Sequence, residues 1–394
     1  MELKRLLSLP VGKNSFFLFG PRQTGKTTLV KKSVKNFEIF EINLLHNETF
    51  LKYKTNPSLF RKEVIFFMTD KKTGIVFIDE IQKLPELLDE IHDLIEKYSR
   101  RISFILTGSS ARKLKRVSTN LLGGRAWSFS LFPFTHQEIG KCFSLSHVLQ
   151  YGSLPPLLGL SKSDIVRTLN AYTGTYLKEE ITDEALVRNL GAFSRFLDLA
   201  ADNSGEIISY STLAREIGLA SKTIKEYYQI LEDTLIAFHL EPYLKSTRKR
   251  MVMHPKYYLF DMGIINSICG RLTSTLKSKT YIYGKLFEHF IILEVNRLIK
   301  YLEKPWRIYF WRTSHGAEVD LIIELPEKKL CGIEIKSAEY VSHKDVKGLK
   351  QFLSDYPHAK GICVCNAQNP YEEESISFLP WRYFFEKGCE IINT

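Results

Sequence analysis

The chain has 394 residues, of which 44% are hydrophobic and 25% are charged, so it is long enough for two or three domains with separate cores. No apolar run approaches the roughly 20 residues of a membrane span, and the first residues lack the apolar core of a signal peptide. We therefore expect a cytoplasmic protein without a membrane partner. A formal net charge of +11 favours a polyanionic partner, with a solvated basic surface as the alternative.

The segment after residue 14 carries the clearest chemical signal. An apolar strand at Phe16–Phe19 leads into the pattern G-x-x-x-x-G-K-[ST], and a helix starts at about Thr28. This arrangement predicts a phosphate-binding loop (P-loop), in which Lys26 contacts the β- and γ-phosphates and Thr27 binds Mg²⁺. A glycine turn between packed elements is the alternative. The expected nucleotide-binding residues are Gly20, Pro21, Arg22, Gln23, Thr24, Gly25, Lys26, Thr27 and Thr28.

A second apolar strand, at about residues 73–78, ends in the two carboxylates Asp79 and Glu80. Ligands of parallel sheets bind at the carboxyl ends of the strands. We therefore predict that Asp79 holds the Mg²⁺ ion and that Glu80 polarises the attacking water. The alternative is an ordinary helix N-terminus, where the helix dipole favours acidic residues.

A third buried strand begins at Ile102 and ends in polar residues. In NTPases with an additional strand, this strand lies between the P-loop strand and the Asp-Glu strand, so Thr107 or Ser109 would touch the γ-phosphate or the attacking water. A simple turn is the alternative. Further on, Arg125 is a candidate catalytic arginine, acting in its own or a neighbouring subunit's site, and the second case implies a homo-oligomer. A surface arginine is equally compatible with the sequence.

These segments together resemble the prokaryotic AAA-superfamily ATPases that carry an uncharacterised C-terminal domain. The resemblance implies an additional-strand P-loop ATPase fold of the α/β class in residues 1–150, with ATP and Mg²⁺ as cofactors. It covers essentially the whole chain and implies no assigned biological role. It rests on Gly20–Thr27, Ile78–Gln82, Leu106–Ser110, Gly124-Arg125, Leu131–Phe134, Tyr151–Pro155 and Tyr176–Glu180.

Residues 151–265 are expected to form a helical and winged-helix domain. The segment Ile208–Leu231 has helix–turn–helix form, with Gly218 in the turn and Ser221 as a cap of the second helix. Two strand-like segments then flank a basic stretch, as in a wing. We predict DNA binding, with an internal packing module as the alternative. The DNA-binding candidates are Lys222, Lys225, Lys245, Arg248, Lys249 and Arg250.

Residues 266–394 show a helix, hairpin strands, a second helix and a further strand. This order resembles the α/β core of the restriction-endonuclease-like PD-(D/E)xK nucleases. The resemblance implies that Asp320 and Glu334 bind a second Mg²⁺ or Mn²⁺, that Lys336 orients or activates water, and that Glu288 supports the site. The same fold also serves as an inactive scaffold, so the sequence leaves cleavage open.

The two carboxylates share a face of the sheet only under one geometric condition. Glu334 and Lys336 lie on the same side of a strand. An even-numbered loop at 326–329 would oppose Glu334 to Leu321 and turn Asp320 to the other face. We therefore predict a loop of odd length or a bulge.

Three functions fit these residues. The first is an ATP-driven DNA-processing enzyme with a nuclease-like end. The second is a nucleotide-dependent switch or scaffold whose C-terminal domain binds nucleic acid or protein without cleavage. The third is a sensor of foreign nucleic acid in which the nucleotide state controls the nuclease-like domain.

Overall fold

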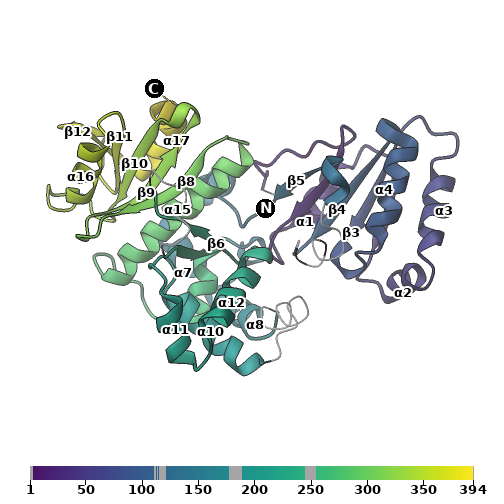
Figure 1. Ribbon diagram of the computed structural model, residues 1–394, viewed down its shortest axis with the longest axis horizontal. Coiled ribbons are helices and arrows are strands. Elements are labelled where there is room, and N and C mark those ends of the chain that lie inside the picture. Colours follow the sequence, from purple (N-terminus) through teal and green to yellow (C-terminus); the bar gives the residue numbers. More distant parts are fainter. Residues whose placement is uncertain are drawn as a thin grey trace.

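The computed structural model describes residues 3–110, 112, 114, 121–176, 189–244 and 254–393. Two sheets lie far apart in Figure 1, and a group of helices in the middle of the chain lies below and between them. Within this part of the chain, no helix is both long and apolar enough to span a membrane.

The N-terminal part is a five-stranded sheet in the order β2-β3-β4-β1-β5, and every neighbouring pair is parallel. Strand β4 lies between β1 and β3, which confirms the predicted additional strand. The strands are β1 Ser15–Phe19, β2 Ile39–Asn43, β3 Gly74–Asp79, β4 Ile102–Gly108 and β5 Ala126–Ser130.

Helices cover both faces of this sheet because its apolar strands are buried on both sides. Phe17 and Phe19 share a core with α3 and α4, whereas Phe16 and Leu18 pack with Val30 of α1. The helices are α1 Lys26–Ser33, α2 Asn47–Thr55, α3 Pro57–Phe67 and α4 Leu87–Tyr98.

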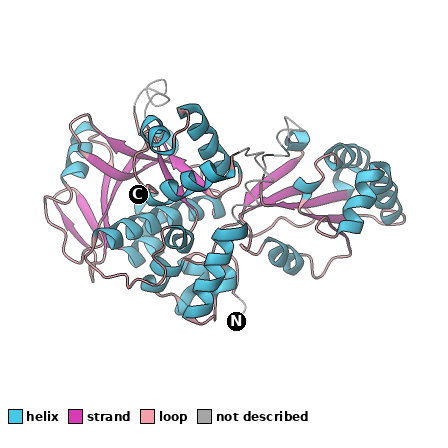
Figure 2. Ribbon diagram, turned by 90° about the horizontal axis from the view of Figure 1, so that it is seen from below, coloured by secondary structure: helices cyan, strands magenta, loops and turns pink. Residues whose placement is uncertain are grey.

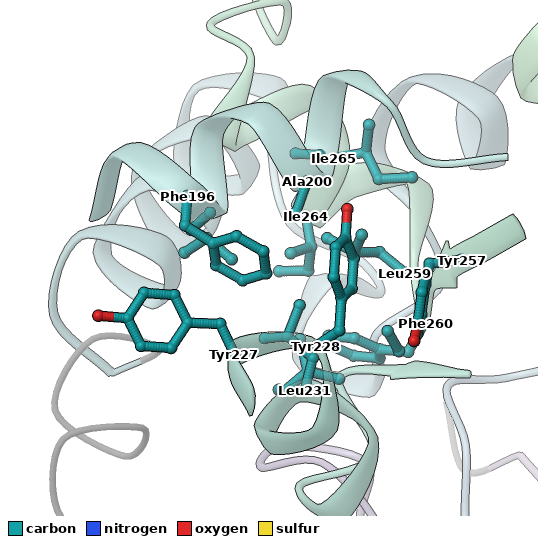
Figure 3. Packing of buried hydrophobic residues seen from close by; sticks show 14 of the residues in the cluster. Phe196, Ala200, Tyr227, Tyr228, Leu231, Tyr257, Leu259, Phe260, Ile264 and Ile265 are labelled. Carbon is teal, nitrogen blue, oxygen red and sulfur yellow. The ribbon is translucent and has the colours of Figure 1, made fainter. Parts of the chain in front are cut away.

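The middle region is helical and is organised around one aromatic core. Figure 3 shows Phe196, Tyr227, Tyr228 and Tyr257 of this core side by side. The elements are α8 Lys162–Ala171, α10 Leu190–Asp202, α11 Tyr210–Ile217, α12 Ser221–Asp233, β6 Ala237–Leu240, β7 Lys256–Leu259 and α14 Met262–Ile268. Two short helices precede them, α6 His136–Ile139 and α7 Leu145–Tyr151, and their buried hydrophobic residues belong to the core of the C-terminal part.

Helices α11 and α12 are followed by the antiparallel strands β6 and β7, in the predicted order, and we call these four elements the helix–hairpin unit. Gly218 ends α11 in the left-handed conformation (φ 76°), which glycine adopts without strain. The prediction that Ser221 caps α12 is wrong, because Ala220 occupies the N-cap position and Ser221 is already helical. The predicted wing residues Lys245, Arg248, Lys249 and Arg250 lie outside the described residues.

The C-terminal part is a mixed six-stranded sheet in the order β12-β13-β11-β10-β9-β8. Helix α16 packs on one face of this sheet, and α15 and α17 pack on the other. Figure 2 shows helices beside the strands of this part, at the end of the molecule where the C-terminus lies. The elements are α15 Tyr281–Tyr301, β8 Arg307–Arg312, β9 Glu318–Glu324, β10 Leu330–Ile335, α16 Lys347–Asp355, β11 Lys360–Cys365, β12 Tyr371–Glu373, β13 Ile376–Pro380 and α17 Trp381–Asn393.

Helix α15 joins the three parts of the chain. Its buried Arg297 donates to the carbonyl oxygen of Phe260 at 2.8 Å and to that of Phe134 at 3.3 Å. Beyond β6, the chain also bonds to β8, because the Tyr243 N–H donates to the Phe310 carbonyl at 2.6 Å. The hairpin therefore continues into the C-terminal sheet. The domain boundaries at 150/151 and 265/266 stay predictions.

Candidate functional sites

The strand, loop and helix of the P-loop are arranged as predicted. Gly20 follows β1 so tightly that a Cβ atom there would lie 2.3 Å from the Leu131 carbonyl oxygen. Gly25 has a left-handed backbone (φ 89°), and α1 begins directly after it. The Lys26 ammonium donates to the carbonyls of Gly20 (2.7 Å) and Pro21 (3.1 Å), which holds its charge inside the loop. The loop, the helix N-terminus and Lys26 thus present positive charge to one point.

Oxygen ligands suited to Mg²⁺ meet beside this loop. Thr27 Oγ1 donates to Asp79 Oδ2 at 2.9 Å, and Thr107 Oγ1 donates to Asp79 Oδ1. Asp79 is 3% exposed at the end of β3, next to the end of β4. A hydroxyl and a carboxylate are the hard oxygen donors that Mg²⁺ prefers, so these residues fit the ion. The metal roles of Thr27 and Asp79 stay predictions.

Glu80 lies over the end of β4. Its Oε2 accepts a hydrogen bond from Gln82 Nε2 at 2.5 Å, and its backbone N–H donates to Thr107 Oγ1 at 3.3 Å. Gln82 Nε2 also donates to Ser109 Oγ at 3.0 Å. Of the two polar residues predicted at the end of β4, Thr107 therefore contacts Asp79 and Glu80, and Ser109 contacts Gln82. Gln82 belongs to the segment Ile78–Gln82 that carries the resemblance, but the sequence analysis gave it no role in the site.

The N-terminal arm binds the P-loop through Arg5, which the sequence did not single out. The Arg5 guanidinium donates to the carbonyls of Thr24 and of Phe132, the latter at 2.8 Å. It also pairs with buried Glu138 at 2.9 Å and lies 4.2 Å from the centre of the Phe134 ring. The loop backbone is thereby tied to the segment that leaves the sheet.

Arg125 lies at the amino-terminal ends of the parallel strands, whereas the P-loop lies at their carboxyl ends. Arg125 directly precedes β5, whose first residue, Ala126, pairs with Ser15 at the start of β1. The P-loop follows the other end of β1, roughly 13 Å further along the strand. Arg125 instead pairs with Glu96 near the end of α4 at 2.7 Å. This geometry places Arg125 away from the P-loop of its own chain, and its catalytic role, in its own or a neighbouring subunit's site, stays a prediction.

The exposed face of α12 carries the two described DNA-binding candidates. Lys222 and Lys225 are both exposed, and the Lys225 ammonium lies 5.2 Å from the centre of the Tyr210 ring. At the other end of α12, Asp233 accepts hydrogen bonds from Ser110 and Arg112, which follow β4. The helix is therefore anchored beside the nucleotide site.

The predicted odd loop is present in the C-terminal sheet. The Leu325 N–H donates a hydrogen bond to the Lys329 carbonyl oxygen at the end of the two strands. The loop between these two residues has three residues, Pro326–Lys328. In the resulting register Ile333 pairs with Leu321, so Glu334 opposes Asp320 on the same face. The prediction of an odd loop is therefore confirmed.

The acidic pair forms part of a larger polar cluster. Asp320 Oδ2 accepts from the Ile335 N–H at 2.7 Å, and Lys336 Nζ donates to Glu334 Oε1 at 2.5 Å. Glu334 Oε2 is buried and has no hydrogen-bond partner in the described part of the chain. Among the described residues, no group of three or more His, Cys, Asp or Glu side chains is placed to hold a metal ion. Metal binding by Asp320 and Glu334 thus stays a prediction.

The charges of this cluster shift its pKa values. Burial, together with the nearby Asp320 carboxylate, raises the pKa of Glu288 to about 7. Burial alone would lower the pKa of Lys336, but the carboxylates of Asp320 and Glu334 raise it above the ordinary value. Lys336 is therefore a stable cation, suited to orienting a ligand rather than to removing its proton.

A second lysine, which the sequence interpretation missed, enters this cluster from the helix–hairpin unit. Lys256 of β7 has a side chain that is only 5% exposed, and its Nζ lies 2.5 Å from Glu318 Oε1 and 3.9 Å from Glu288 Oε1. Tyr258, two residues on, donates to Glu288 Oε1 at 3.3 Å. A lysine opening an otherwise apolar strand was the only signal in the sequence.

Known families and proteins match all three parts of the chain. Residues 12–140 match a family model described as an AAA domain. Residues 143–275 and 283–384 match two models described as domains of unknown function, DUF8612 and DUF4143. Neither description names a nuclease or a DNA-binding activity.

Similar proteins extend over most of the chain. An uncharacterised protein of Mycobacterium tuberculosis is 26% identical over 81% of this chain and 69% of its own length, and one of Mycobacterium bovis gives the same values. An uncharacterised protein of Methanocaldococcus jannaschii is 22% identical over 94% of this chain and 84% of its own length. The chain therefore carries an AAA domain, the nucleotide-binding unit of P-loop ATPases, followed by two regions whose families have no assigned function.

Proposed function

We propose that this protein is a Mg²⁺-dependent ATPase that couples its nucleotide state to nucleic acid through the helix–hairpin unit. One observation carries the proposal: Thr27 and Thr107 both bond to Asp79 beside the P-loop, so the phosphate-binding and metal-binding groups converge. The AAA domain match supports ATP as the nucleotide.

The chain's own residues divide the hydrolytic work. Lys26 and the N-terminus of α1 bind and orient the phosphates. Glu80 polarises the water that attacks the γ-phosphate, and Thr107 keeps Asp79 and Glu80 in register. Thr27 and Asp79 would hold the Mg²⁺ ion, which would supply positive charge against the phosphates.

Support for a nucleic-acid partner comes from the exposed lysines of α12 and the net charge of +11. Lysines on one helix face bind phosphates without reading sequence, so this binding should weaken steeply with salt. Ser110 and Arg112, which follow β4, bond to the Asp233 end of α12. Binding of nucleic acid to α12 would therefore act on the nucleotide site through these bonds. A switch or scaffold that binds a protein instead is the alternative.

The test is ATP hydrolysis by the full chain with double-stranded, single-stranded or branched DNA, with Lys26→Ala as the blank. We expect Lys26-dependent hydrolysis that one DNA form stimulates. The double variant Lys222→Ala/Lys225→Ala should lose most of this stimulation, whereas Lys62→Ala/Lys344→Ala, which removes two exposed lysines elsewhere, should keep it. Hydrolysis that is indifferent to every DNA form would support the switch or scaffold instead.

A second function, metal-dependent cleavage of nucleic acid, is favoured by the C-terminal cluster. Asp320, Glu334 and Lys336 share one face, and Glu334 Oε2 is a buried acceptor with no hydrogen-bond partner among the described residues. We expect Mg²⁺- or Mn²⁺-dependent loss of DNA that Asp320→Asn and Lys336→Ala abolish. Glu327→Gln, in the exposed hairpin loop, is the matched control and should cleave normally. DNA binding without cleavage in the wild type would leave an inactive scaffold.

A further inference from the structure

Glu80 is held by a side chain that the P-loop motif does not include. Gln82 lies on the short turn Ile81–Lys83 directly after Glu80 and is 4% exposed. Its Nε2 donates to Glu80 Oε2 at 2.5 Å and to Ser109 Oγ at 3.0 Å. Both N–H bonds of the amide are therefore used, and the carboxylate is tied to the end of β4.

The end of β4 is where a reacting phosphate would lie. Strand β4 is between β1, which leads into the P-loop, and β3, which carries Asp79. Glu80 has a left-handed backbone (φ 61°, ψ 47°), which costs about 1 kcal/mol or more in a non-glycine residue and persists only where neighbours impose it. A residue that fixes the Glu80 carboxylate here also fixes the water that Glu80 polarises.

The same end of β4 is bonded to helix α12. Ser110 Oγ donates to the Asp233 carbonyl at 3.3 Å, and Arg112 Nη1 donates to Asp233 Oδ2 at 3.3 Å. Asp233 is the last residue of α12, and Gln229 donates to its Oδ1 at 3.2 Å. Ser110 contacts α12, and its neighbour Ser109 contacts Gln82. A displacement of α12 would therefore shift the hydrogen-bond partner of Gln82 through a single peptide unit.

We infer that Gln82 is a positioning residue for Glu80, and that the Asp233 end of α12 sets how firmly Gln82 is held. The inference rests on the proposed ATP hydrolysis and goes beyond it by naming the element that controls the step. None of the contacts of Gln82 or Asp233 described above includes the P-loop. Gln82 and the Asp233 end of α12 therefore affect kcat and not the affinity for the nucleotide.

The test compares kcat and KM for ATP in the full chain for the wild type, Gln82→Met, Gln82→Ala and Asp233→Ala. Methionine keeps nearly the length and volume of glutamine without a donor, so it separates hydrogen bonding from packing. We expect both Gln82 variants to lower kcat about 10- to 100-fold, with KM changed less than about twofold.

The link to α12 has its own arm in this experiment. Asp233→Ala should lower kcat about 3- to 10-fold, whereas Glu226→Ala, on the exposed face of the same helix, should keep the wild-type rate. The double variant Gln82→Met/Asp233→Ala should be no slower than Gln82→Met, because both changes interrupt one link.

Each contrary result has a distinct meaning. Wild-type kcat in Gln82→Met would overturn positioning by the amide, and wild-type kcat in Asp233→Ala, or additive losses in the double variant, would overturn the link to α12. If the wild type shows no hydrolysis that Lys26→Ala removes, the proposed function fails and takes the inference with it. An active wild type with unaffected variants overturns the inference alone.

Discussion

The residues of the nucleotide site lie in short strand–loop segments, whereas the ion pairs of Arg5 and Lys256 join segments that are far apart in the chain. Lys26, Thr27 and Asp79 follow from spacing within strand–loop segments, and they do meet beside the P-loop. Arg5 and Lys256 could not be found this way. The partner of Arg5 lies 133 residues along the chain, and Lys256 reaches the Glu318 carboxylate of another sheet, so only packing brings these charges together.

At Gly20 the absence of a side chain is a requirement. A methyl group there would lie 2.3 Å from the Leu131 carbonyl oxygen, so the loop backbone would have to move. We expect Gly20→Ala to abolish detectable ATP binding and to lower the free energy of unfolding by about 1–3 kcal/mol. Titration calorimetry and thermal unfolding measure the two effects. Gly191→Ala, where the nearest atom is 3.7 Å away, is the control and should bind normally.

Buried His289 should make the fold sensitive to acid. Burial, with added repulsion from Lys285 and Arg297, lowers its pKa from 6.5 to about 4. The folded state then binds fewer protons than the unfolded state between these values, so stability is unaffected above pH 6.5 and falls as the pH drops towards 4. The loss approaches about 3 kcal/mol.

Thermal unfolding of His289→Gln against pH measures this effect. Its midpoint should fall less steeply between pH 6.5 and 4.5 than the wild-type midpoint. His315→Gln, which changes an exposed histidine, should follow the wild type. Parallel curves for the wild type and His289→Gln would show that His289 does not set the acid sensitivity.

At the scale of elements, the topology could be predicted where the hydrophobic pattern of a segment was combined with a rule of sheet geometry. Buried apolar runs gave the parallel strands, and the requirement that Asp320 and Glu334 share a face gave the odd loop. The predicted order ended at the strand of residues 361–365, and β12, β13 and α17 follow it in the structure. The position of Arg125 could not be predicted in this way. Whether it lies at the amino or the carboxyl ends of the strands depends on the residue at which β5 begins, and no pattern in the sequence fixes that residue.

The N-terminal arm should behave as a functional element of the nucleotide site. Arg5→Ala leaves buried Glu138 without its cation and frees the Thr24 carbonyl. We expect a loss of stability of about 3–5 kcal/mol and weaker ATP binding, measured by unfolding and by calorimetry. Lys4→Ala, next to Arg5, is the control. Unchanged ATP affinity in a folded Arg5→Ala variant would contradict the role of the arm.

At the scale of the molecule, the two regions of unknown function are built as one packed body. Residues from the end of the AAA domain, from β7 and from α15 share a single core, which includes Phe134, Tyr258 and Phe287. This sharing was not visible in the sequence, because each segment alone reads as an ordinary amphipathic element.

The ion pair between Lys256 and Glu318 has an evolutionary consequence. One partner comes from the region matched by the first model of unknown function and the other from the second, so loss of Lys256 would remove a cation from the carboxylates of the second region. A chain that loses this lysine should lose the acidic partner in the same lineage. We therefore expect a recombinant that joins the two regions from distant relatives to be less stable where one of these two charges is missing.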